Sequence, residues 1–584
     1  MKETWSLDEL YLGFDDPKFQ ADMDRLEHLL AAYSDITGQL AQMEPKDALV
    51  KALRCQEEIQ TVSSNLGMFA MLRQSADTRD AKSASTAEKV WDMLAEMEGS
   101  SAIFRHFVAK LDNLDDLIAA DPLLTEYAYL LHNIQADSKY LLSEKEEILF
   151  AKMNMSGASA WEQLQANLTS SVPVEYDGKT ITLSTVRNMA YDPDPAVRKA
   201  AYDAELKCYD RIKDAVAFSL NSIKLQVISE CKLRGYKSPL DQALHLSHMK
   251  RETLDAMWSA IDEYLPKFWA YYKAKAKALG YEGGLPWYDM FAPMGKNDKK
   301  YTIEEARDVI LELFGSFDAD LQAMGKQAFD QAWIDFYPRE GKVGGAFDCG
   351  VPSIKQSRVL TNFDGAYGDI VTLAHELGHA FHDRNTFSHR PLNLDYSMPV
   401  AETASTFNEN IVNHAALAAA QSDDEKLAIL ESMLMDAAQI ICDIYSRYLF
   451  ETAVFDNRSS EFMPADRLCE MMLEAQKKAY GDGLDHATLH PYMWLCKSHY
   501  YSGSLSFYNF PYAFGGLFAR GLYVRYQQEG DAFVAKYKQM LHATTVCDVE
   551  DAAKIAGVDL TDRKFWLASL QSLAEDIDQF IALV

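Results

Sequence analysis

Apolar residues recur at intervals of three and four positions through most of the chain, which is the spacing of one face of an α-helix. The region 16–152 shows this stripe most clearly, and strand signals are almost absent from it. Its best example is formed by Met23, Leu26, Leu29, Leu30 and Tyr33. The pattern predicts a run of amphipathic helices at the start of the chain.

A short alternation of apolar and polar residues over 172–183, centred on Asp177-Gly178, predicts a small β-hairpin. Helical spacing resumes at Asp194, where aspartate can cap free backbone N–H groups and Pro195 suits the first turn. We therefore expect a boundary within 183–194. It separates an N-terminal helical region, 1–185, from a second domain, 186–584.

Gly-rich and β-branched segments interrupt the helical pattern between residues 281 and 363, and they predict short strands over 341–351 and 358–363. Helices return afterwards. We expect them from 369 onward, over 400–418, 424–459 and 464–480, and at 564–583. The fold class predicted from this order is mainly α with a small β-sheet.

The charge of the chain limits the classes of partner that it can bind. Asp and Glu outnumber Lys and Arg by 87 to 57, which gives a formal net charge of -30, and no basic patch is evident. We therefore expect neither nucleic acid nor an anionic membrane as a partner. The acidity would favour cationic substrates, although solubility alone also explains it.

The N-terminal residues, the apolar stretches and the cysteines indicate the cellular compartment. Residues 1–10 lack the basic start and apolar run of a secretory signal, and no stretch approaches 18 uninterrupted apolar residues. We expect a cytoplasmic protein. Its eight cysteines are scattered without a CxxC pair, which argues against a disulfide framework and against a thiolate zinc site.

The most informative stretch is IVTLAHELGHAFHD at 370–383, whose spacing is helical. It places His375 and His379 four residues apart, on one face of a helix and close enough to bind one ion. Glu376 lies beside them and can reach a water molecule on that ion. The arrangement predicts a metal centre for hydrolysis, with Glu376 as the base.

A catalytic zinc usually takes three protein ligands and leaves one position to water, so a third ligand is needed. The predicted helix 397–414 carries Glu402 and Glu409 on one face, with Ser397 near its cap. We assign Glu402 as the ligand and Glu409 as the partner that orients an imidazole. The reverse assignment stays open, as does a solvated helix face, but the weakly polar surroundings favour a cation.

His382 shares a face with His379, three residues further on. A fourth protein ligand would displace the water, so we expect His382 to pack in the core or to support a ligand. The expected cofactor is one Zn²⁺ per chain, because two imidazoles and a carboxylate favour zinc over manganese or cobalt.

HELGHAFH followed by MPVAETASTFNE resembles the thimet oligopeptidase and oligoendopeptidase F family of zinc metallopeptidases, in particular its oligoendopeptidase F branch. The resemblance extends to WSLDELY at 5–11, DPDPAVRKAAYDA at 192–204 and WIDFYPREGKVGGAF at 333–347. It implies a zincin-like, two-lobed helical ellipsoid with a deep substrate channel, a zinc near the channel floor and a short sheet beside it. Residues 186–584 would then be the catalytic zinc-peptidase domain.

The resemblance also implies a substrate class and further site residues. A narrow channel would admit flexible oligopeptides and exclude folded proteins, whose unfolding costs several kcal/mol. An edge strand would bind the peptide backbone, and either 341–350 or 358–362 matches it. His499, Tyr508 and Tyr512, within HYYSGSLSFYNFPY, match the residues that face the substrate carbonyl in the family.

These expectations describe an endopeptidase in which Glu376 moves the proton and Tyr508 or His499 donates to the oxyanion. Two alternatives remain. A zinc carboxypeptidase would share HExxH with a later glutamate, but it would need a cationic group for the substrate's terminal carboxylate. A catalytically silent peptide-binding protein would keep the fold without the chemistry, which the intact Glu376 argues against.

Overall fold

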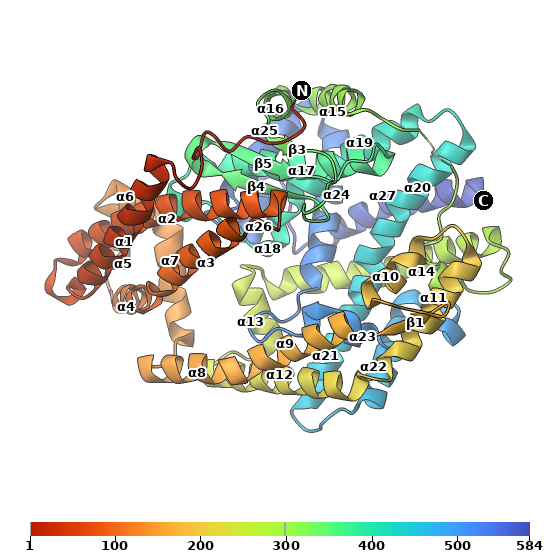
Figure 1. Ribbon diagram of the computed structural model, residues 1–584, viewed down its shortest axis with the longest axis horizontal. Coiled ribbons are helices and arrows are strands. Elements are labelled where there is room, and N and C mark those ends of the chain that lie inside the picture. The colour runs from red at the N-terminus through yellow and green to blue at the C-terminus, as the bar shows by residue number, and fades with distance from the viewer. Residues whose placement is uncertain (1, 297–298) are drawn as a thin grey trace.

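The computed structural model describes residues 2–296 and 299–584 (Figure 1). Helices account for most of it and the strands are few and short, so the predicted mainly α fold is confirmed. In Figure 1 the N-terminal helices lie on one side, and two further helical layers lie above and below the middle of the molecule. None of the described helices combines the length and apolar character needed to cross a membrane.

The N-terminal helices enclose a hydrophobic core of their own, which runs from Leu10 to Leu131 and includes Val351 from the sheet. These helices are α1 Pro17–Thr37, α2 Pro45–Ala76, α3 Ala81–Ala95, α4 Glu98–Ala109, α5 Leu114–Ala119, α6 Pro122–Glu126 and α7 Ala128–Asp137. The larger second core begins at Ala158. A domain division at residue 185 stays a prediction.

The next helices form much of the lower layer in Figure 1. They are α8 Glu144–Ser156, α9 Ala158–Ser171, α10 Leu183–Asn188, α11 Pro195–Tyr209, α12 Lys213–Arg234, α13 Pro239–Leu246 and α14 Arg251–Ala278. The predicted hairpin is present as β1 Val174–Tyr176 and β2 Lys179–Ile181, with Asp177 and Gly178 both at positive φ. The cap at Asp194 is also confirmed, because its carboxylate accepts from the Ala196 N–H.

Two sequence expectations for elements were incomplete. The segment 183–194 is not a plain linker, since it contains α10, whose Leu183 and Val186 are buried. Six residues are too few for helical periodicity to be visible. Between 281 and 363 the structure also contains two helices that the glycine-rich neighbourhood obscured, α15 Ile303–Phe317 and α16 Ala319–Asp330.

The upper layer carries a three-stranded sheet in the order β3–β5–β4, formed by β3 Ile334–Asp335, β4 Phe347–Val351 and β5 Gln356–Leu360. β4 pairs antiparallel with β5, and β3 pairs parallel with it. The strands expected over 341–351 and 358–363 are therefore present but shorter or shifted. β4 packs against α17 Tyr367–Thr386, the helix that contains the HExxH motif.

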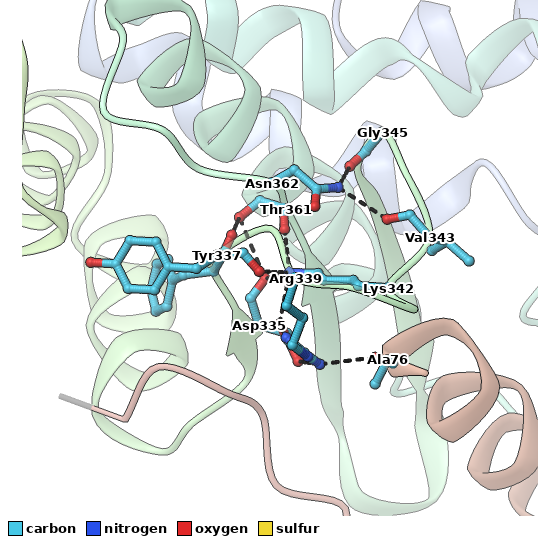
Figure 2. A network of polar contacts seen from close by, with 10 residues as sticks. Ala76, Asp335, Tyr337, Arg339, Lys342, Val343, Gly345, Thr361 and Asn362 are labelled. Carbon is cyan, nitrogen blue, oxygen red and sulfur yellow. Dashed lines mark hydrogen bonds and ion pairs between the residues drawn. The ribbon is translucent and has the colours of Figure 1, made fainter. Parts of the chain in front are cut away.

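A polar network around the buried Asp335 fixes the loop that leads into β4 (Figure 2). Asp335 accepts from Arg339 at 2.6 and 2.8 Å and from Lys342 Nζ at 2.7 Å. Arg339 also donates to the Ala76 carbonyl of α2, and Asn362 donates to two carbonyls of the loop. The network therefore holds the sheet, the loop and the N-terminal helices together.

The remaining helices complete the second core. They are α18 Met398–Ala401, α19 Thr403–Ala419, α20 Asp423–Ala438, α21 Ile444–Arg458, α22 Ala465–Tyr480, α23 Met493–Cys496, α24 Phe510–Glu529, α25 Asp531–Ala543, α26 Val549–Ile555 and α27 Arg563–Leu583, with a π-helical turn at Gln439–Asp443 between α20 and α21. All eight cysteines are free thiols, as their scatter predicted.

Candidate metal centre

The two motif histidines lie on α17, which begins where Asp369 accepts hydrogen bonds from the backbone N–H groups of Asp364 and Ala366, both at 2.9 Å. The carboxylate thereby satisfies donors that a helix start leaves free. Leu373 and Leu377 bury one face of α17 in the core. The other face is left to His375 and His379.

Glu402 stands at a break in the second helix predicted from sequence. The chain forms α18, leaves helical geometry at Glu402, with φ -87° and ψ 8°, and continues as α19. Ser397 occupies the position before α18, but its side chain makes no capping hydrogen bond. From this break the Glu402 side chain reaches His375 and His379 of α17.

Gly378 allows the two helices to approach. A Cβ at this position would lie 2.5 Å from both the Ala404 carbonyl oxygen and the Ser405 Cα. Such distances are well inside van der Waals contact, so only glycine fits between the two histidines at this separation. The glycine of HELGH is therefore a packing requirement of the site.

Three donor atoms meet at the centre. His375 Nε2 and His379 Nε2 are 3.2 Å apart, and Glu402 Oε2 lies 3.3 Å from the first and 3.4 Å from the second. Ligands at the usual zinc distances of ~2.0–2.1 Å in a tetrahedron are separated by roughly 3.4 Å. The triangle therefore has the dimensions of one face of a zinc coordination tetrahedron.

Glu409 lies behind this triangle, where its Oε1 is 2.6 Å from His375 Nδ1. This contact directs Nε2 of His375 toward Glu402, the arrangement that orients a metal-binding imidazole. Burial would lower the pKa of His375, but hydrogen bonds to Glu402 and Glu409 outweigh it and raise the pKa to about 10. The carboxylates thus create a strong local preference for positive charge.

Glu376 is buried and points to the same centre. One of its carboxylate oxygens lies within 4.8 Å of a nitrogen of each histidine. Burial raises its pKa, and the histidines only partly offset this. A carboxylate with a raised pKa accepts a proton more readily, as a general base requires.

The tyrosines and histidine of the later segment also come together. The ring of His499 lies 5.1 Å from that of Tyr508 and 6.0 Å from that of Tyr512, which are 5.3 Å from each other. Apart from a short 3₁₀ turn at Ser498–Tyr500, the segment is a loop up to Asn509, as expected, but Tyr512 belongs to the first turn of α24. Tyr500 and Tyr501 lie apart from this group and are fully buried core residues.

The aromatic group is close to the metal centre. Burial raises the pKa of Tyr512, and both Tyr508 and the carboxylate of Glu402 raise it further. Burial and the cations Arg447 and Lys497 lower the pKa of His499 to about 4, so its ring is neutral near pH 7. Neutral phenols and a neutral imidazole can each donate a hydrogen bond to an oxyanion.

His382 does not join the donor triangle. It is fully buried, its Nε2 lies 2.8 Å from Thr544 Oγ1, and its ring stacks on Tyr396 with centroids 4.1 Å apart. Burial lowers the pKa of His382 to about 3. The structure therefore places it in the core, which is the first of its two expected roles.

Sequence reasoning missed three groups near the centre. Ser405 Oγ donates to Glu402 Oε2 at 2.7 Å and helps to hold that carboxylate. Asp383 and Asp348 bring two buried carboxyl groups together beside His379, and burial raises the pKa of Asp383 to about 6. Asp383 follows His379 by four residues, so helical spacing could have found it. Asp348 comes from β4, which no local pattern connects to α17.

Comparison with known proteins agrees with this geometry. The family model for Peptidase family M3 matches residues 188–572, and the Oligopeptidase F model matches 110–172. The chain is 26% identical to the Oligopeptidase PepF of Bacillus subtilis, over 100% of this chain and 87% of that protein. It is 25% identical to the Oligoendopeptidase F homolog of Lactococcus lactis subsp. lactis, over 100% and 97%.

Solved structures share the fold. A crystal structure from Chlamydophila abortus superimposes with a TM-score of 0.85 at 20% identity, covering 100% of this chain and 98% of that one. The oligoendopeptidase-F of Enterococcus faecium superimposes with a TM-score of 0.72 at 18% identity, covering 97% and 98%. The chain therefore belongs to peptidase family M3, in its oligoendopeptidase F branch, and is a metallo-endopeptidase.

Proposed function

We propose that this enzyme is a zinc-dependent endopeptidase that hydrolyses short, unfolded oligopeptides within a restricted channel, with one Zn²⁺ held by His375, His379 and Glu402. The observation that carries the proposal is the donor triangle of 3.2, 3.3 and 3.4 Å, whose edges match zinc coordination. The side chains of these residues are 24, 19 and 37% exposed, so water can reach the metal position.

A Zn²⁺ bound there would polarise the scissile carbonyl and acidify a water molecule from a pKa of ~15.7 toward ~7. Glu376 accepts the proton of the attacking water and delivers it to the leaving nitrogen. Tyr508 and His499 donate hydrogen bonds to the carbonyl oxygen as negative charge develops, and Tyr512 supports them. Each such donor contributes on the order of 3 kcal/mol in comparable sites.

The sheet supports one of the two candidate segments for backbone binding. Val359 and Leu360 of β5 pair with β3 on one side and β4 on the other, so the segment 358–362 has little free edge. β4 is an edge strand, and it packs against α17. We propose that an extended peptide pairs with β4, which overlaps the candidate segment 341–350 at residues 347–350.

The test compares the wild type with Glu376→Gln, using metal analysis and mass spectrometry of products from a mixed peptide library. We expect both proteins to hold zinc and only the wild type to turn over. Substantial turnover by the variant would remove Glu376 from the base role. Cleavage of peptides that are amidated at the C-terminus separates an endopeptidase, which cleaves them, from a carboxypeptidase, which does not.

A further inference from the structure

A cavity lies near the chain segment that carries the proposed substrate-facing group, His499, Tyr508 and Tyr512. It has a free volume of about 200 Å³ and lies between α10, α11, the π-helical turn and the chain after α23. Its lining includes Arg187, Tyr191, Met290, Phe291, Gln439 and Lys497. Lys497 precedes His499 by two residues, and its charge helps to lower the pKa of His499. Lys497 and Asp443, which both line the cavity, also act on the charge of His499, so the cavity lies near the proposed substrate-facing group.

One of the cations around this cavity, Lys497, has no carboxylate at ion-pair distance in the described part of the chain. Three cations have carboxylate partners in the pairs Arg187–Glu205 at 2.8 Å, Arg198–Asp289 at 2.7 Å and Arg447–Asp443. Lys497 forms no ion pair or hydrogen bond with any side chain in the described part of the chain. The Lys497 ammonium is therefore unpaired, in a protein whose formal net charge is -30.

The surroundings of Lys497 disfavour its positive charge. Lys497 is only partly exposed, and burial together with the nearby Arg447 lowers its pKa more than the Asp443 carboxylate raises it. A partly buried cation near other cations costs free energy unless an anion compensates it. A ligand carboxylate would supply that anion, because charge-assisted hydrogen bonds to lysine are strong in a partly dry site.

The rest of the lining suits the end of a peptide. Tyr191, Met290 and Phe291 provide an apolar surface, and the amide of Gln439 can both donate to and accept from a peptide bond. An apolar pocket with a few placed polar groups is typical of a small-ligand subsite. We propose that this cavity binds the C-terminal residue of the peptide substrate, with Lys497 pairing with its carboxylate and the aromatic wall contacting its side chain.

This proposal rests on the proposed function, because it assigns a specificity residue to the same reaction. Under this proposal the enzyme is an endopeptidase that prefers peptide substrates with a free C-terminal carboxylate. Amidated peptides remain substrates but are cleaved more slowly. An acidic side chain near the end of the peptide offers the same chemistry, so the test must separate the two sources.

The experiment measures kcat/KM for matched peptides ending in a free acid, in an amide, or in an amidated glutamate. We expect the wild type to prefer the free acid over the amide by at least ~10-fold, the size of one charge-assisted hydrogen bond. Lys497→Met should abolish that preference and Lys497→Arg should keep most of it. Lys277→Met, which changes an exposed lysine of α14, is the control. Cleavage of the amidated glutamate peptide at the free-acid rate would assign the carboxylate to a side chain.

A binding measurement separates this proposal from the proposed function. Calorimetry with the inactive Glu376→Gln protein should give tighter binding for the free acid than for the amide, and Lys497→Met added to that protein should make them equal. An acid preference that survives Lys497→Met, or an equal loss with both peptides, overturns the subsite. Failure of Glu376→Gln to abolish turnover would overturn the mechanism and leave the binding result standing.

Discussion

Replacing Gly378 by alanine tests whether close approach of α17 and α19 sets the donor triangle. The new Cβ would lie 2.5 Å from the Ala404 carbonyl oxygen, whereas ordinary contact begins at 3.4 Å, so the helices must separate by about 0.9 Å. Such overpacking typically costs ~1–3 kcal/mol of stability. It would also lengthen the distances of 3.3 and 3.4 Å from Glu402 to the histidines.

Zinc tolerates only small changes in ligand distance. We therefore expect Gly378→Ala to weaken zinc binding by ~10–100-fold, the usual loss when a group that positions a metal ligand is removed. Competition with a fluorescent chelator measures this affinity, and thermal unfolding of the metal-free protein measures the stability term. Gly368→Ala is the matched control, because Gly368 lies on the same helix and a Cβ there would meet no other atom within 4 Å. An unchanged zinc affinity in Gly378→Ala would refute the packing argument.

Three further changes test other parts of the account. Tyr508→Phe should lower kcat by ~10²–10³-fold with little change in zinc content, because it removes one donor to the oxyanion, and a wild-type kcat would exclude that role. Lys342→Met should destabilise the protein by ~1–3 kcal/mol in urea unfolding, because the buried Asp335 keeps Arg339 but loses its second cationic donor. Exposed Lys326→Met is the control. Burial opposes ionisation of Glu205, but His490 and Arg187 lower its pKa to about 2. The ionised carboxylate therefore stabilises the fold fully above pH ~4.5, and that stabilisation is lost as the pH falls toward 2. Glu205→Gln should therefore cost on the order of 3 kcal/mol at pH 7, and a gap from wild type that does not narrow between pH 4.5 and 2.5 would contradict this assignment.

The helical fold could be predicted because amphipathic spacing is a local property. Met23, Leu26 and Tyr33 are buried as their spacing indicated, and the hairpin at Asp177-Gly178 follows from turn chemistry. Helix α10 was not found, because six residues do not display a period. Helices α15 and α16 were hidden by neighbouring glycines and strands.

The candidate site divides in the same way. His375, Glu376 and His379 lie within five residues of one another, so helix geometry alone brings them together. Glu402 needed a second helix and a chain reversal, and the helix break at this residue has no clear sequence signal. Asp348 and Lys497 depend on the packing of distant elements, which only the folded chain reveals.

The most direct test of the central claim is the zinc content per chain of the wild type, Glu376→Gln and Glu402→Ala after dialysis against a weak chelator. The account predicts one zinc in the wild type and in Glu376→Gln, and a loss of most of it in Glu402→Ala, which lacks the third ligand. Full retention of zinc by Glu402→Ala would contradict the assignment of His375, His379 and Glu402 as the metal site.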